Sequence, residues 1–129
     1  MSRLLHGRVI RSGEARGEAI VSPEPIGFLG GVDPESGRVS EKGHPLESQS
    51  LAGRILVFPR GKGSTVGSFV IYRLARQGVA PAGMVLAECE PIIALGAIMA
   101  DRPTVDQVDV GQIRTGDRVT IRADEVIVE

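Results

Sequence analysis

One short segment of the sequence combines residue types that can do chemistry. Gly61-Lys62-Gly63-Ser64-Thr65 places two glycines, a lysine and two hydroxyl residues directly after an apolar run. Glycines let backbone N–H groups approach a ligand closely, and Lys62 adds a flexible positive charge suited to a phosphate or carboxylate. A helix that begins here adds its positive end to the same corner. The segment therefore predicts an anion-binding site, with Ser64 as a candidate reactive group.

Four interpretations of this loop differ in what they require. In the simplest, Ser64 or Thr65 only caps the following helix. A nucleotide-binding P-loop needs lysine immediately before the serine or threonine, and Gly63 separates Lys62 from Ser64. A phosphohistidine carrier domain needs a histidine shortly after the loop, and residues 61–77 contain none. The last two requirements are not met, so a helix cap and a catalytic serine base remain.

The loop lies between an expected strand and an expected helix. Arg54 to Phe58 is an almost continuous apolar run ended by Pro59, as in a strand buried on both faces. From Val66 onward, apolar residues recur at helical spacing as far as Gly78, a common helix end. The pattern then repeats, which predicts a β-α-β-α-β unit. Its further members are expected at Met84–Ala87, Pro91–Met99 and Pro103–Val105.

Short segments near both chain ends predict a second β-layer. Leu4–Ile10 and Glu18–Val21 are apolar-rich runs typical of strands joined by tight turns. They are broken by Gly7, Gly13 and Gly17. Arg118–Arg122 and Glu125–Val128 alternate polar with apolar residues, which predicts a terminal hairpin.

The expected elements assemble into an α/β fold of the three-layer β/β/α type. A small parallel sheet carries two helices and joins the β-layer built from both chain ends. Pro23–Ser50, rich in glycine and proline, is expected to cross the surface as a long irregular excursion. The length of 129 residues fits a single domain over residues 1–129.

The overall composition restricts the class of protein. Fifteen basic against 16 acidic residues leave no positive field to attract nucleic acid. The longest apolar stretch, Ile92–Ala100, is about half of the roughly 20 residues that a membrane helix needs. We therefore expect a cytoplasmic protein without nucleic-acid or membrane partners. Because Cys89 is the only cysteine, an iron–sulfur cluster must belong to a partner.

Several segments resemble the aconitase X swivel domain family. The first is the loop Arg60–Ser68. Further similar segments follow the family's order at Gly30–Gly37, Gly43–Leu46, Ala52–Val57 and Glu90–Ile98. The resemblance spans nearly the whole chain, and ordered agreement of several motifs is far more specific than one glycine loop.

The resemblance implies the small subunit of a two-chain hydro-lyase. A large partner subunit would carry a [4Fe-4S] cluster that acts as Lewis acid on the departing hydroxyl, with no cluster on this chain. Ser64 would accept the proton, and the substrate would be bound by Lys62, Gly63, Thr65 and Gly31. One branch of the family dehydrates (R)-5-phosphomevalonate, a phosphorylated small molecule, to trans-anhydromevalonate 5-phosphate in the modified archaeal mevalonate pathway. Another branch dehydrates cis-3-hydroxy-L-proline, and a non-catalytic anion- or partner-binding module is the remaining alternative.

Other candidate residues have simpler explanations. We expect His44, before a proline, to hydrogen-bond backbone, and His6 to be structural. Asp33 is expected to open a proline turn rather than bind a metal. Cys89 stands between Glu88 and Glu90, whose charges disfavour its thiolate, so a structural role is expected.

Overall fold

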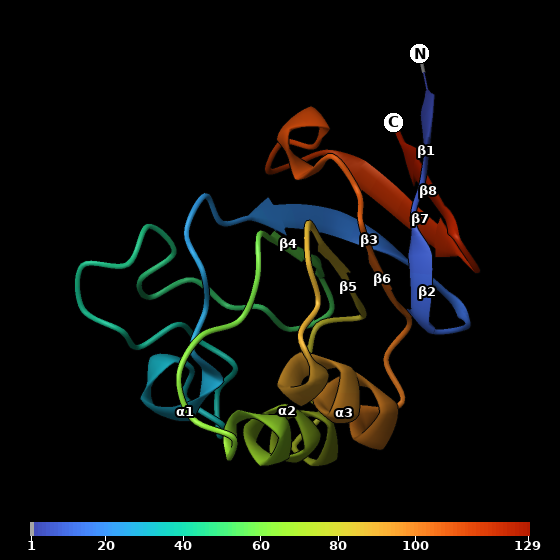
Figure 1. The fold of residues 1–129 in the computed structure, drawn as a ribbon. Helices are drawn as coiled ribbons and strands as arrows, with labels where there is room; N and C mark the ends of the chain where they lie inside the picture. Colours follow the sequence, from blue (N-terminus) through green and yellow to red (C-terminus); the bar gives the residue numbers. More distant parts are fainter. Residues whose placement is uncertain (1) are drawn as a thin grey trace.

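Within the described residues, eight strands form one hydrogen-bonded series that bends over on itself, with the α-helices below it in Figure 1. The computed structural model describes residues 2–129. The strands are β1 (Arg3–His6), β2 (Arg8–Arg11), β3 (Glu14–Val21), β4 (Ile55–Phe58), β5 (Gly83–Leu86), β6 (Thr104–Asp106), β7 (Arg118–Arg122) and β8 (Glu125–Val128). The helices are α1 (Phe28–Gly31), α2 (Gly67–Arg76), α3 (Pro91–Ala100) and the short 3-10 helix η1 (Val110–Gln112). In space the strands follow the order β1-β8-β7-β3-β4-β5-β6-β2.

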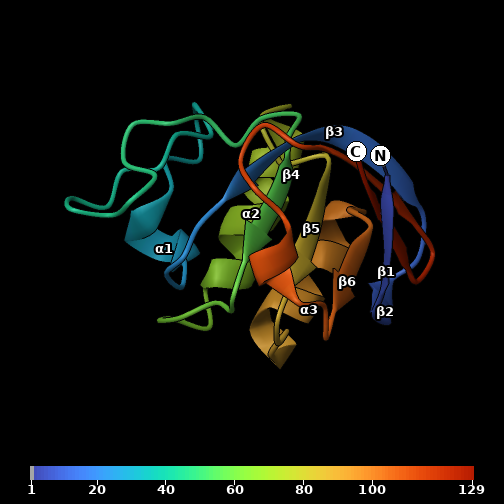
Figure 2. The ribbon, with the colours of Figure 1, turned by 90° about the horizontal axis from the view of Figure 1, so that it is seen from above.

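Strand β3 belongs to both β-layers. Its first part, Glu14–Glu18, runs antiparallel to β7, and its last part, Ala19–Val21, runs parallel to β4. On one side of β3, β7, β8 and β1 make an antiparallel layer from the two chain ends. On the other side, β4, β5 and β6 continue the parallel sheet. Figure 2 shows β3 curving across the molecule between the two layers.

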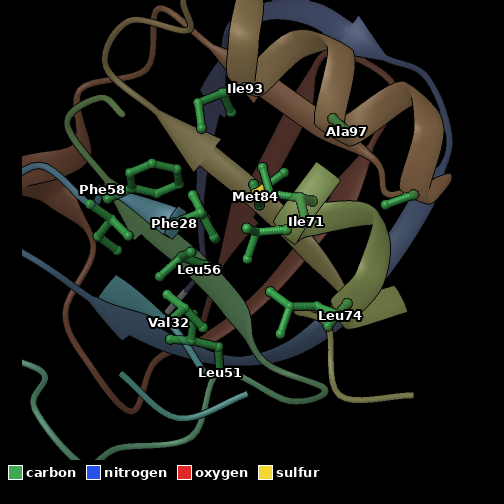
Figure 3. Close-up of a cluster of buried hydrophobic side chains, with 14 of the residues drawn as sticks. Phe28, Val32, Leu51, Leu56, Phe58, Ile71, Leu74, Met84, Ile93 and Ala97 are labelled. Atoms are coloured by element: carbon green, nitrogen blue, oxygen red, sulfur yellow. The ribbon is translucent and has the colours of Figure 1, made fainter. Parts of the chain in front are cut away.

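The central strands are apolar on both faces because each face covers a different core. In β4, Leu56 and Phe58 join the cluster on the helix side, whereas Ile55 and Val57 join the cluster between the two sheets. This alternation follows from the two-residue period of a strand. On the helix side the strand residues meet Ile71, Leu74, Ile93 and Ala97 from α2 and α3 (Figure 3).

The structure confirms the predicted three-layer β/β/α arrangement. The predicted hairpin strands agree residue for residue with β7 and β8, and the predicted strand–loop–helix unit agrees with β4 and α2. The helix predicted from Val66 to Gly78 spans Gly67–Arg76, and Gly78 follows it with a φ of +74°.

Two details near the amino terminus were predicted wrongly. Strand β2 lies at the far edge of the parallel sheet, antiparallel to β6, and not in the end-built layer. A bidentate ion pair from Arg8 to the buried Asp106, at 2.8 and 2.9 Å, holds it there. Gly17 is no turn but lies within β3, where a Cβ would sit 2.9 Å from the carbonyl oxygen of Gly53. This glycine thus permits a close backbone approach.

The long excursion over residues 23–50 is irregular, as expected, but it is anchored. Within it, the described chain has only the four-residue α1 and isolated bridges. Buried apolar side chains attach it to the helix-side core. These are Ile26, Phe28, Val32, Val39 and Leu46. The excursion therefore packs beside the start of α2 instead of extending away from the fold.

We find no helix within residues 2–129 whose length and hydropathy would let it cross a bilayer.

Candidate active site

The predicted glycine loop connects the end of β4 to the start of α2, in lime green in Figure 1. It leaves the carboxyl end of a parallel strand, where open α/β sheets commonly bind ligands. Gly61 pairs with Ile26 as an isolated parallel bridge, and the Lys62 N–H donates to the Ile26 carbonyl at 3.1 Å. The first half of the loop is thus held by the excursion, while Gly63, Ser64 and Thr65 are exposed.

Ser64 presents an exposed hydroxyl whose oxygen already receives one backbone donor. The N–H of Val66 donates to Ser64 Oγ at 3.0 Å, and the N–H of Gly67 donates to the Ser64 carbonyl at 3.0 Å. A donor aimed at an oxygen favours the charged form of that oxygen. The fixed N–H group therefore favours the alkoxide of Ser64, the form of the side chain that can accept a proton and become a neutral hydroxyl.

The predicted helix cap at Ser64 or Thr65 was wrong. The N-cap position is Val66, and no side chain of the described residues caps it. The turn that Ser64 makes with Val66 ends before the helix begins at Gly67. The Ser64 oxygen thus accepts the N–H of the N-cap residue Val66, one position before the first helical residue.

Gly63 and Thr65 flank the serine. Gly63 has a φ of +92°, a conformation that favours glycine, and a Cβ there would meet no described atom within 4 Å. Its backbone thus borders open space beside Ser64. The Thr65 carbonyl accepts the hydroxyl of Ser68 at 3.1 Å, which fastens the loop to the first turn of α2.

Lys62 and Gly31 meet through a residue that the sequence did not single out. The ammonium of Lys62 lies 3.2 Å from Glu41 Oε2. Gly31 is buried, and a Cβ on it would lie 3.5 Å from Glu41 Oε1. Gly31 therefore adjoins the loop through Glu41, and its predicted place at the substrate stays a prediction.

Glu90 is a second residue that the sequence reasoning missed as part of this loop. Its Oε1 accepts the N–H of Gly61 at 3.3 Å. A Cβ on Gly61 would lie 2.6 Å from Glu90 Oε2, so only glycine lets the carboxylate lie this close. Glu41 and Glu90 stand 21 and 29 residues from their loop partners. No local spacing pattern could have identified them.

An apolar groove of about 240 Å³ opens beside the loop, between α1 and α2. It is lined by Leu29, Gly30, Val32, Pro34, Val66, Phe69, Val70 and Arg73. Val66 belongs to both groove and loop, so an apolar surface begins two residues after Ser64. The site thus combines a hydroxyl, an ammonium and an apolar wall.

The remaining candidates have the structural settings that were expected. His44 is buried, with Nε2 3.2 Å from the Pro25 carbonyl and Nδ1 accepting the Leu46 N–H at 3.0 Å. Asp33 accepts the N–H of Glu35 and the hydroxyl of Ser36, and these bonds hold the pKa of its carboxyl below the ordinary value.

Cys89, the only cysteine of the sequence, is buried. Burial, together with the charges of Asp106 and Glu90, raises the pKa of its thiol to about 12. Within residues 2–129, no three His, Cys, Asp or Glu side chains are placed to hold a metal ion. One buried thiol does not fit an iron–sulfur cluster, which needs several thiolates.

Comparison with known proteins assigns the fold and the loop to one family. A model of the aconitase X swivel domain matches residues 4–129. Phosphomevalonate dehydratase small subunits of Thermococcus onnurineus and Thermococcus gammatolerans are 52% and 54% identical to this chain. Each match covers 97% of this chain, and 96% and 95% of the respective relative.

A solved structure agrees with these sequence matches. The crystal structure of Thermococcus kodakaraensis aconitase X in its holo-form superposes with a TM-score of 0.97 at 50% identity, covering 98% of both chains. With a family model that spans nearly the whole sequence and relatives above half identity, the chain belongs to the aconitase X swivel domain family.

Proposed function

We propose that this chain is the small subunit of a two-chain phosphomevalonate dehydratase. The enzyme would remove water from (R)-5-phosphomevalonate to give trans-anhydromevalonate 5-phosphate. Relatives of that name, matched over nearly their full length, support the reaction, and the word subunit in their names supports a large partner. The chain acts as one swivel domain that closes the partner's site.

The chemical role of this chain is carried by one observation. The exposed Ser64 hydroxyl receives the N–H of Val66 at 3.0 Å and stands at the carboxyl end of a parallel strand. As an alkoxide, Ser64 Oγ accepts the proton removed from the substrate carbon next to the one that loses its hydroxyl, and it becomes a neutral hydroxyl. The loop N–H stabilises the negative charge on Oγ before the transfer. A [4Fe-4S] cluster on the large subunit would supply the Lewis acid for the departing hydroxyl.

The remaining loop residues bind and orient the substrate. Lys62 provides a point charge for the phosphate, and Gly63 and Thr65 leave backbone exposed on either side of Ser64. The apolar groove beside Val66 fits the hydrocarbon part of a small branched acid. These contacts hold the reacting carbon near Ser64 Oγ.

The decisive experiment replaces the serine in the reconstituted two-subunit enzyme. Ser64→Ala is expected to lower kcat by about 10²–10⁴-fold, the range for loss of a general base. Because Ser64 is exposed, the variant should fold and bind the large subunit normally. Ser12→Ala changes an exposed serine in the β2–β3 connection and serves as the control.

The outcomes separate the alternatives. Near-normal turnover by Ser64→Ala would overturn the proton-acceptor role. Turnover of cis-3-hydroxy-L-proline in place of 5-phosphomevalonate would overturn the substrate assignment. Purification with partners that carry no iron and sulfide would favour a non-catalytic binding module.

A further inference from the structure

Among residues 2–129, only the ion pair between Lys62 and Glu41 joins the excursion to the loop through opposite charges. Lys62 Nζ lies 3.2 Å from Glu41 Oε2, and the two side chains are 46% and 34% exposed. The pair connects the serine loop to a residue 21 positions earlier in the chain. The positive charge expected to bind substrate phosphate is therefore already paired with a carboxylate.

A glycine lies beside each member of this pair. A Cβ on Gly27 would lie 3.3 Å from Lys62 Cγ and 3.1 Å from the Lys62 carbonyl oxygen. A Cβ on Gly31 would lie 3.5 Å from Glu41 Oε1. The lysine stem thus lies over Gly27, and the carboxylate lies against Gly31.

The Lys62 ammonium can exchange Glu41 for another anion. Partly exposed ion pairs are weak, because water competes for both charges. An ammonium has three donors on a flexible stem and can turn to another acceptor without breaking the fold. A phosphate carries more charge than a carboxylate and is the stronger competitor for it.

We propose that Glu41 is a positioning residue that holds the Lys62 ammonium beside Ser64 and releases it to the phosphate of the incoming substrate. The inference rests on the proposed function and adds a residue to it. Glu41 keeps the ammonium in place while the site is empty. It also disfavours free phosphate, which must break the ion pair without the further contacts that the whole substrate makes.

The test measures binding of inorganic phosphate to the full chain by NMR, through the loop amides of Gly63, Ser64 and Val66. Glu41→Gln is expected to tighten phosphate binding by up to about fivefold, which corresponds to about 1 kcal/mol. Lys62→Gln should weaken binding. In the Lys62→Gln background, Glu41→Gln should have no further effect, because the group that Glu41 neutralises is gone.

A matched control removes the same charge elsewhere. Glu14 pairs with Arg122 at 2.9 Å on the end-built layer, with both side chains more than half exposed. Glu14→Gln changes net charge equally and should leave phosphate binding unchanged. An equal effect of Glu14→Gln, an effect of Glu41→Gln that persists without Lys62, or no loop shift in any of the proteins would overturn the proposal.

The reconstituted enzyme gives a second readout. With Glu41→Gln, inorganic phosphate should become a stronger inhibitor, and KM for 5-phosphomevalonate should change more than kcat. An unchanged inhibition constant together with a fall in kcat would indicate a merely structural role and overturn the proposal. The NMR titration requires no turnover, so failure of the dehydration assay alone would count against the proposed reaction and not against the exchange at Lys62.

Discussion

Ser64 and Cys89 show how the surroundings of a side chain decide whether it can carry a negative charge. Both stand shortly after parallel strands, yet their surroundings differ. The Ser64 oxygen is exposed and faces an N–H donor. Cys89 is buried, and its sulfur faces the Glu90 carbonyl at 3.6 Å while its N–H donates to Asp106. A donor favours an anion, whereas burial among acceptors disfavours one.

We therefore predict that Cys89 resists alkylation in the native protein. Its pKa is raised to about 12, so almost no thiolate exists at pH 8. The measurement is the iodoacetamide reaction rate at pH 8, with urea-unfolded protein as the control, where the thiol should react like an ordinary cysteine. Because the folded pKa is raised, burial of the neutral thiol favours the native state below about pH 9 and this contribution is lost as pH rises toward 12. Equal native and unfolded rates would contradict the buried assignment.

Among the elements, α2 and α3 cross very closely at Gly96. A Cβ at this position would lie 2.7 Å from Ile71 Cδ1, 3.1 Å from Ile71 Cβ and 3.3 Å from the Ser68 Cα. The end of the isoleucine side chain can move, but the Ser68 backbone can move only with its helix. Since Ser68 is in the first turn of α2, this crossing also positions the end of the helix at which the serine loop enters.

Gly96→Ala is expected to destabilise the fold. Overpacking lowers the free energy of unfolding by about 1–3 kcal/mol, whereas the higher helix propensity of alanine raises it by about 1 kcal/mol. A net loss of about 1 kcal/mol corresponds to a fall in Tm of about 3–5 °C, measured by calorimetry. The control is Gly67→Ala, where the nearest contacts of a Cβ are an ordinary 3.8 and 3.9 Å and Tm should hold or rise. A Tm increase for Gly96→Ala would contradict the close crossing.

The sequence was sufficient for elements whose patterns are local. Strand β4 and the β7–β8 hairpin follow from periodicity, and the glycine loop follows from composition. The pairing of β2 with β6 could not be predicted from a local pattern, because it depends on the buried Asp106, almost 100 residues away in the sequence. In the site, Ser64 and Lys62 could be named from the loop itself. Glu41 could not, since it comes from a segment without periodicity that only folding brings to the loop.

At the scale of the whole molecule, two separate cores share the central strands. One lies between the helices and the parallel sheet, and the other lies between the two sheets. Strand β3 passes from one layer to the other without a loop, and β1 pairs with β8 with Arg3 opposite Val128. The chain ends therefore lie side by side, as Figure 1 shows.

This proximity predicts that the chain tolerates circular permutation. A short glycine-rich linker from residue 129 to residue 2, with new ends between the exposed Lys42 and Gly43, should give a folded protein. Its circular dichroism spectrum should match the parent, with Tm within a few degrees. The control protein has the same break between Lys42 and Gly43 but no linker from residue 129 to residue 2, and it should be less stable than the permutant. A permutant that remains unfolded would contradict the observed pairing of the ends.

The pairing of β1 with β8, and of β3 with β7, also has a consequence for how the protein is made. During synthesis β1 and β3 emerge well before their hydrogen-bonding partners β8 and β7. Their unpaired edges stay open until β7 and β8 have left the ribosome. The nascent polypeptide thus exposes these strand edges while the segments between them are being made, and the end-built layer closes only when β7 and β8 are available.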